Sequence, residues 1–269
     1  MKDELSLLAI DDVDVEKGMT DYKNVQIFTK LLIGSQKTPL NFVFDTGSDL
    51  LWYFSSHCED CTTVMKAFNE SESETFSMVP AMNDLHFGSG SVYGYMAKDK
   101  VCLSEEKCSE GFGFTSIVSQ RGLAGLRAQG VVGMSAAEPT GESNEGDFFL
   151  DKLHTTGTID QRVFSIYINT VDNESRITYG GFDLEKFAHP AHQQLMWHSL
   201  SSDWFNQHVH WQLSLESMTV DGYSLVQNKQ VIVDSGTSLI LMPAEDRQAI
   251  VDTIAKKRNL DCELFGYAE

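Results

Sequence analysis

The sequence predicts an all-β, barrel-like fold with few short helices. Apolar and polar residues alternate over many short stretches, which are separated by glycine, asparagine, aspartate and serine. Few stretches show the spacing of apolar residues that an amphipathic helix needs. Many strands with sparse helices are typical of β-barrels and β-sandwiches. The stretches expected to be strands are 25–29, 31–33, 40–44, 92–101, 164–169, 176–179, 211–220 and 230–233.

Two short helices are expected between or after these strands. Residues 147–154 place two phenylalanines and a leucine on one side, and Gly157 follows as a stop signal. Residues 243–259 begin with a proline, which suits the first helical turn because its missing N–H would have no partner there. The acidic, weakly periodic residues 1–21 are expected to form a flexible extension, and they lack the apolar core of a signal peptide.

Composition excludes some functions. The chain has 269 residues, of which 42% are hydrophobic, so it can bury a substantial core in one large domain or two lobes. Its formal charge of −19 repels phosphate backbones, so no nucleic-acid partner is expected. No apolar run is long enough to span a membrane.

Four of the five cysteines form two close pairs, Cys58 with Cys61 and Cys102 with Cys108. Such pairs suit two short disulfide loops formed in an oxidising compartment. A zinc site built from His57, Cys58 and Cys61 is the alternative, although a structural zinc site needs a fourth ligand. Cys262 has no partner nearby in the sequence.

The strongest pattern in the chain occurs twice. Residues 42–50 and residues 231–239 both read as three apolar residues, an aspartate, a hydroxyl residue, glycine, a hydroxyl residue, a further polar residue and leucine. One copy could be an ordinary turn, since aspartate and glycine are turn residues in any protein. Two copies far apart predict two similar lobes that each present one carboxylate, Asp45 and Asp234.

The residue types around each aspartate suit a shared acid–base site. A glycine lets backbone approach the opposite carboxylate, and the hydroxyls can hydrogen-bond the carboxylates or cross the junction between the loops. Two carboxylates that face each other cannot both ionise easily, so they share one proton and supply an acid and a base together. The residues expected to support the pair are Thr46, Gly47, Ser48, Ser235, Gly236, Thr237 and Ser238.

Over residues 22–265 the chain resembles the pepsin-like aspartic peptidases. Besides the two motifs, Trp52 falls where the family has a tryptophan, residues 86–94 resemble the flap hairpin, and residues 129–134 resemble the loop that backs the first aspartate. Three further segments, residues 163–167, 180–181 and 211–213, also resemble sequences that the family has at corresponding positions and in the same order.

The resemblance implies a bilobal fold, with an N-terminal lobe over residues 22–180 and a C-terminal lobe over residues 181–269. It implies an aspartic endopeptidase in which Asp45 and Asp234 activate a water at acidic pH, without a metal, another cofactor or a covalent intermediate. Expected partners are extended polypeptide substrates and pepstatin-type inhibitors, the chain is expected to be a monomer, and its expected place is the secretory route or an acidic lysosome- or vacuole-like compartment. The residues expected at the flap and substrate pocket are Phe87, Gly88, Ser89, Trp52 and Val131.

The chain departs from the family pattern in two places. Phe87 stands where the flap usually has a tyrosine, and between Asp234 and Glu269 no second apolar–glycine loop follows, so the C-terminal lobe is expected to be incomplete relative to the family. These departures favour an alternative, a catalytically weak or inactive peptide-binding homologue. A small-molecule-binding β-barrel is a further alternative, but it gives no reason for two matched motifs.

Overall fold

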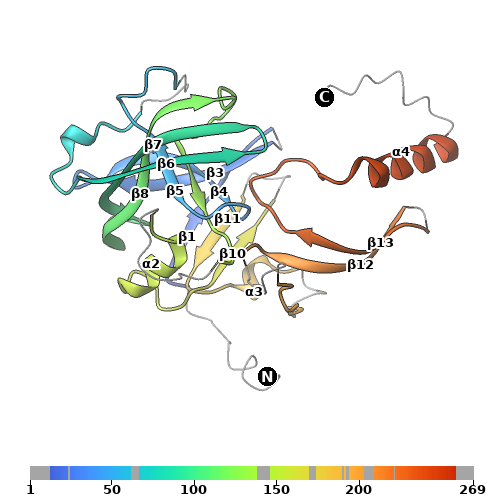
Figure 1. Cartoon of the computed structure of the whole chain (residues 1–269). Coiled ribbons are helices and arrows are strands. Elements are labelled where there is room, and N and C mark those ends of the chain that lie inside the picture. Colours follow the sequence, from blue (N-terminus) through green and yellow to red (C-terminus); the bar gives the residue numbers. More distant parts are fainter. Residues whose placement is uncertain are drawn as a thin grey trace.

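A computed structural model describes residues 13–23, 25–61, 67–137, 146–169, 174–189, 191, 194–202, 209–220 and 222–258. Strands dominate it, as the sequence predicts, and helices are few and short (Figure 1). The elements in chain order are β1 (Val15–Gly18), β2 (Thr20–Tyr22), β3 (Gln26–Ile33), β4 (Thr38–Asp45), β5 (Leu51–Phe54), η1 (Glu70–Glu72), β6 (Ser77–Phe87), β7 (Gly90–Cys102), β8 (Cys108–Arg121), β9 (Gly130–Gly133), α2 (Phe149–Thr155), β10 (Phe164–Tyr167), β11 (Arg176–Tyr179), α3 (Leu184–Phe187), β12 (Gln212–Val220), β13 (Tyr223–Ile232) and α4 (Ala244–Arg258).

The largest sheet has eight strands in the order β2-β3-β4-β9-β5-β8-β7-β6, with a further pairing of β3 with β7. Strand β4 runs parallel to β9, and this register places Asp45 opposite Gly133. Strands β4, β5 and β9 are buried almost throughout because apolar side chains pack against both of their faces. The end of β4 is therefore a rigid position in the centre of the main core.

A second sheet has the order β1-β11-β10. Its strand β1 pairs with β11, so that Val15 lies opposite Tyr179, whose ring packs near Phe44 and Phe149. This pairing corrects the prediction of a flexible extension over residues 1–21, because residues 15–18 and 20–22 form strands. Residues 1–12 lie outside the described part of the chain.

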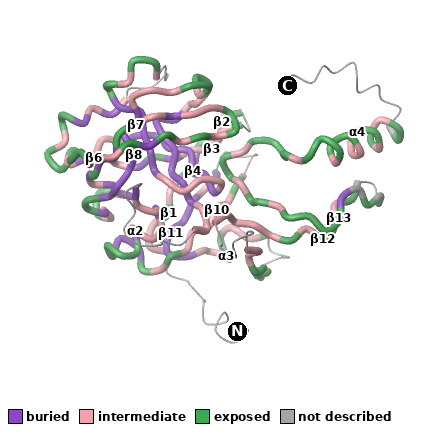
Figure 2. Tube along the Cα trace, in the orientation of Figure 1, coloured by how far each residue is buried: buried purple, intermediate pink, exposed green. Residues whose placement is uncertain are grey.

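The third sheet contains only β12 and β13 among the described residues. Figure 1 shows this hairpin and α4 extending to one side of the body that β1 to β11 form, and Figure 2 shows that both are largely exposed. Among the residues from 182 to 258 whose burial the structure describes, Val226 is the one that is buried. An ion pair of 3.4 Å between Lys229 and Asp246 joins the hairpin to α4. The division into lobes at residues 180 and 181 stays a prediction.

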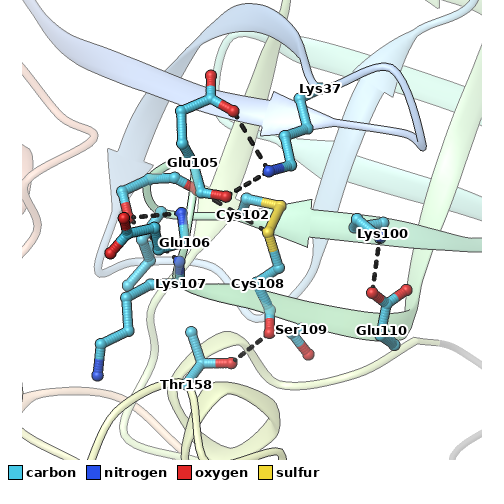
Figure 3. The surroundings of a disulfide bond; sticks show 12 residues. Lys37, Lys100, Cys102, Glu105, Glu106, Lys107, Cys108, Ser109, Glu110 and Thr158 are labelled. Carbon is cyan, nitrogen blue, oxygen red and sulfur yellow. Dashed lines mark hydrogen bonds and ion pairs between the residues drawn. A yellow bond between two sulfur atoms is a disulfide. The ribbon is translucent and has the colours of Figure 1, made fainter.

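Both predicted disulfides are present. Cys58 is joined to Cys61, so these sulfurs are not free thiolates for the alternative zinc site, and Cys102 is joined to Cys108. Figure 3 shows the second disulfide, where Thr158 donates a hydrogen bond of 3.0 Å to the Cys108 carbonyl oxygen. Cys262 lies outside the described residues.

Each predicted strand and both predicted helices overlap an element of the structure. The stretches 25–29 and 31–33 form the single strand β3, and β13 begins at Tyr223 rather than at residue 230. Strands β1, β2, β5, β6, β8 and β9 fall outside the stretches predicted as strands. Fully buried strands such as β5 and β9 show no alternation of apolar and polar residues in their sequences. No helix in the described part of the chain is long and apolar enough to cross a membrane.

Candidate active site

Asp45 ends strand β4 and is supported by strand β9 beside it. The Met134 N–H donates to the Asp45 carbonyl oxygen at 2.8 Å, and the Ser135 N–H donates to the Ser48 carbonyl oxygen at 3.0 Å. Asp45 itself is only 9% exposed. The backbone on both sides of this aspartate is thus fixed by the main core.

The two aspartates accept matching sets of hydrogen bonds. Asp45 Oδ1 accepts from the Gly47 N–H at 3.0 Å, and its Oδ2 accepts from Ser48 Oγ at 2.5 Å. Asp234 Oδ1 accepts from the Gly236 N–H at 2.8 Å, and its Oδ2 accepts from Thr237 Oγ1 at 2.5 Å. The repeated sequence therefore folds into a repeated local structure that orients each carboxylate.

The two loops are locked together by Thr46 and Ser235. Thr46 Oγ1 donates to the Val233 carbonyl oxygen at 2.7 Å and accepts from the Ser235 N–H at 2.9 Å. In return, Ser235 Oγ donates to the Phe44 carbonyl oxygen at 2.6 Å and accepts from the Thr46 N–H at 3.1 Å. Each hydroxyl thus reaches across to the backbone of the other loop.

Glycine is required on both sides of this junction. A Cβ atom on Gly47 would lie 2.7 Å from the Asp234 carboxylate, and a Cβ atom on Gly236 would lie 2.2 Å from Asp45 Oδ1. Any larger residue would push the loops apart. Each carboxylate therefore lies directly over the glycine of the opposite loop.

The pKa of the Asp45 carboxyl is raised from 3.8 to about 6. Burial is the largest cause, because it penalises the charged form. The hydrogen bonds from Ser48 and Gly47 act in the opposite direction, whereas the charge of Asp234 and a hydrogen bond with it raise the pKa further. The pair consequently holds a proton in mildly acidic solution that an isolated aspartate would release.

The paired carboxylates open into a cleft of about 690 Å³. The residues that the sequence places at the flap and pocket all line it, namely Trp52, Phe87, Gly88, Ser89 and Val131. Several further lining residues are not evident from the sequence, namely Val25, Ile27, Leu123, Leu126, Leu239 and Leu241. Nothing marks these apolar residues in the sequence, because they look the same as residues of a core.

The ring of Phe87, at the end of β6, packs against Trp52 with the ring centroids 6.0 Å apart. The Trp52 indole is buried, and its Nε1 has no hydrogen-bond partner among the described residues. A phenylalanine at this position keeps the ring contact but offers no oxygen to the indole.

Comparison with known proteins identifies the class to which this fold and site belong. The family model of eukaryotic aspartyl proteases matches residues 26–265, and the chain therefore belongs to that family. Among its relatives, pepsin-3 of Oryctolagus cuniculus is 28% identical over 96% of this chain and 65% of its own length. Cathepsin D of Bos taurus is 29% identical over 85% of this chain and 60% of its own length. Vacuolar protease A of Neurospora crassa is 24% identical over 90% of this chain and 59% of its own length. The chain therefore spans less than two thirds of the length of each of these relatives.

Proposed function

We propose that this protein is an aspartic endopeptidase that cleaves extended polypeptides in mildly acidic solution. One observation carries the proposal: two aspartate loops, far apart in the sequence, interlock, and the carboxylates of Asp45 and Asp234 line the same cleft. Family membership supports the reaction class.

In the proposed reaction, a water held between the two carboxylates attacks the scissile carbonyl carbon. One aspartate, ionised, takes the proton of the water, while the other, protonated, donates a hydrogen bond to the carbonyl oxygen and stabilises the tetrahedral intermediate. A proton then passes to the leaving amine as the C–N bond breaks. The raised pKa of Asp45 keeps the shared proton on the pair up to about pH 6, which suits an acidic compartment such as the vacuole that one relative's name indicates.

The cleft suits a peptide with apolar side chains near the cleaved bond. Phe87 and Trp52 line the cavity, and so do four leucines, Leu123, Leu126, Leu239 and Leu241. An extended peptide can bond its backbone to the glycine-rich flap around Gly88, as extended peptides do at the edges of sheets. Inhibitors of the pepstatin type would occupy the same cleft.

A catalytically weak or inactive peptide-binding homologue is the second candidate function. Two observations favour it: the loop of Asp234 has no supporting strand like β9 among the described residues, and Phe87 leaves the Trp52 indole without a partner. Such a protein would bind peptides in the cleft but would not cleave them.

Cleavage of an acid-denatured protein at about pH 4 to 5 separates the two candidates, since the raised pKa of Asp45 keeps the pair protonated there. We expect cleavage that a pepstatin-type inhibitor blocks, and we expect Asp45→Asn and Asp234→Asn each to lower kcat by about 10³-fold, because general acid–base catalysis contributes on that order. Asp151→Asn is the matched control, since it removes only an ion pair with Arg162 on the surface. Peptide binding without cleavage in the wild-type chain would establish the second candidate instead.

A further inference from the structure

We propose that Gln120 is a positioning residue that connects the disulfide loop of Cys58 and Cys61 to one wall of the substrate cleft. The inference rests on the proposed function, because it concerns how tightly the cleft holds a substrate. It assigns a role in substrate binding to a loop that does not itself line the cleft.

The wall in question is the segment of residues 122–126, which follows strand β8. Leu123 and Leu126 line the cleft and also pack against the smaller hydrophobic cluster that contains Trp52. Among the described residues this segment has no strand partner, so the side chains that bond its backbone help to fix its position.

Gln120 uses both ends of its side-chain amide for this purpose. Its Oε1 accepts a hydrogen bond of 2.9 Å from the Leu123 N–H, and its Nε2 donates a hydrogen bond of 2.9 Å to the Asp60 carbonyl oxygen. One planar group therefore fixes the distance between the cleft wall and the loop that carries Asp60.

The Asp60 carboxylate fixes the other side of this link. Its Oδ1 accepts from the Gln120 N–H at 3.0 Å, and its Oδ2 accepts from Ser119 Oγ at 2.9 Å. Asp60 lies between Cys58 and Cys61, and their disulfide closes the loop and limits the conformations of the aspartate. The chain of contacts thus runs from the disulfide through Asp60 and Gln120 to Leu123.

A second glutamine holds the far end of the same wall. Gln26 Nε2 donates to the Gly125 carbonyl oxygen at 3.1 Å, and Gln26 Oε1 accepts from the Arg127 N–H at 2.9 Å. Because Gln26 remains when Gln120 is changed, we expect the wall to loosen near Leu123 without detaching. The aspartate pair has separate support from β9 and the Thr46–Ser235 contacts, so its chemistry should stay intact.

Steady-state kinetics on the full chain test the proposal. We expect Gln120→Ala to raise KM about fivefold with kcat unchanged, since the hydrogen bond from the Leu123 N–H and the one to the Asp60 carbonyl oxygen are lost and the reacting groups are not disturbed. Asp60→Ala should also raise KM. Asp60→Asn keeps an oxygen acceptor for the Gln120 N–H, so its KM should lie close to that of the wild type. Gln227→Ala is the matched control, because its amide bonds Ser224 on the β12–β13 hairpin, away from the cleft.

A second measurement does not depend on catalysis. Hydrogen exchange of the Leu123 amide should become faster in Gln120→Ala and stay at the wild-type rate in Gln227→Ala. Unchanged exchange at Leu123, or an unchanged KM in a folded Gln120→Ala, would overturn the positioning role. A wild-type chain that cleaves nothing would contradict the proposed function, and the exchange result would still decide whether Gln120 holds the wall.

Discussion

The two aspartate loops have nearly the same local structure but very different surroundings. Asp45 ends a strand in the centre of an eight-stranded sheet, and Phe44 before it is buried. Asp234 follows a two-stranded hairpin, and Val233 before it is 55% exposed. Six residues after each aspartate stands an apolar side chain, Leu51 and Ile240, and the first is fully buried whereas the second is 77% exposed.

This difference shows which interactions the motif supplies by itself. The hydrogen bonds of each carboxylate come from the next few residues, so they form equally well in both loops. Burial depends on what packs over the loop, and strand β9 does this only for Asp45 among the described residues. For Asp234, the main tie to the rest of the molecule is the junction with the first loop.

The largest expected effect compares the two equivalent apolar positions. We expect Leu51→Ala to lower the free energy of unfolding by about 2–5 kcal/mol, because it leaves a cavity in a close-packed core. Ile240→Ala should change it by less than about 0.5 kcal/mol, since that side chain is already in solvent. Urea unfolding measures both values, and similar losses would mean that Ile240 is covered in solution.

The next effect concerns pH. Because the folded-state pKa of Asp45 is raised to about 6 from 3.8, its contribution to stability is fully present below about pH 3.8 and is lost as the pH rises through 6. This loss corresponds to about 3 kcal/mol. Asp45→Asn carries no charge at this position. Between pH 4 and pH 7 we therefore expect its free energy of unfolding in urea to rise by about 3 kcal/mol relative to that of the wild type.

Asp234→Asn is the comparison for that measurement, because it leaves Asp45 buried and removes only the charge of Asp234, which is a smaller cause of the raised pKa of Asp45. Its gain in unfolding free energy over the same pH range should therefore be smaller. Equal gains would contradict the view that burial of Asp45 is the main cause of its raised pKa. We also expect kcat/KM of the wild type to fall as the pH rises through about 6.

Loss of either hydroxyl at the junction between the two aspartate loops should destabilise the protein to the same extent. Thr46→Val and Ser235→Ala each remove two hydrogen bonds between the loops, so each should cost about 2 kcal/mol of unfolding free energy. Thermal unfolding of both variants at one pH measures these two losses of stability. A loss in only one variant would show that the junction is not the shared support that its geometry indicates.

The smallest effect is expected at the flap, which belongs to the better supported region. Phe87→Tyr offers the buried Trp52 Nε1 an acceptor, and a net hydrogen bond of about 1 kcal/mol corresponds to about a fivefold rise in kcat/KM. Peptide cleavage at fixed pH measures it, with Phe87→Leu as a control that cannot form the bond. An unchanged or lower kcat/KM for Phe87→Tyr would contradict the hypothesis that the flap is weakly positioned.

Much of the molecule could be predicted from its sequence because the deciding interactions are local. Alternation and turn residues predicted most strands, and close spacing predicted both disulfides. The cleft wall at Leu123 and Leu126 could not be predicted, since apolar side chains in a loop look the same whether they face a core or a cleft. The strand β1 was missed because its partner, β11, lies far away in the sequence.

The sequence by itself determined the two aspartate loops, since the aspartate, hydroxyl and glycine residues within each motif supply the bonds that orient the carboxylate. Only the tertiary structure decided how each loop is supported. Packing against β9 buries Asp45 and raises its pKa, whereas Asp234 depends on hydrogen bonds from the opposite loop. The physical reason is that hydrogen bonds of a turn form between near neighbours, whereas burial requires segments that are distant in the chain to pack together.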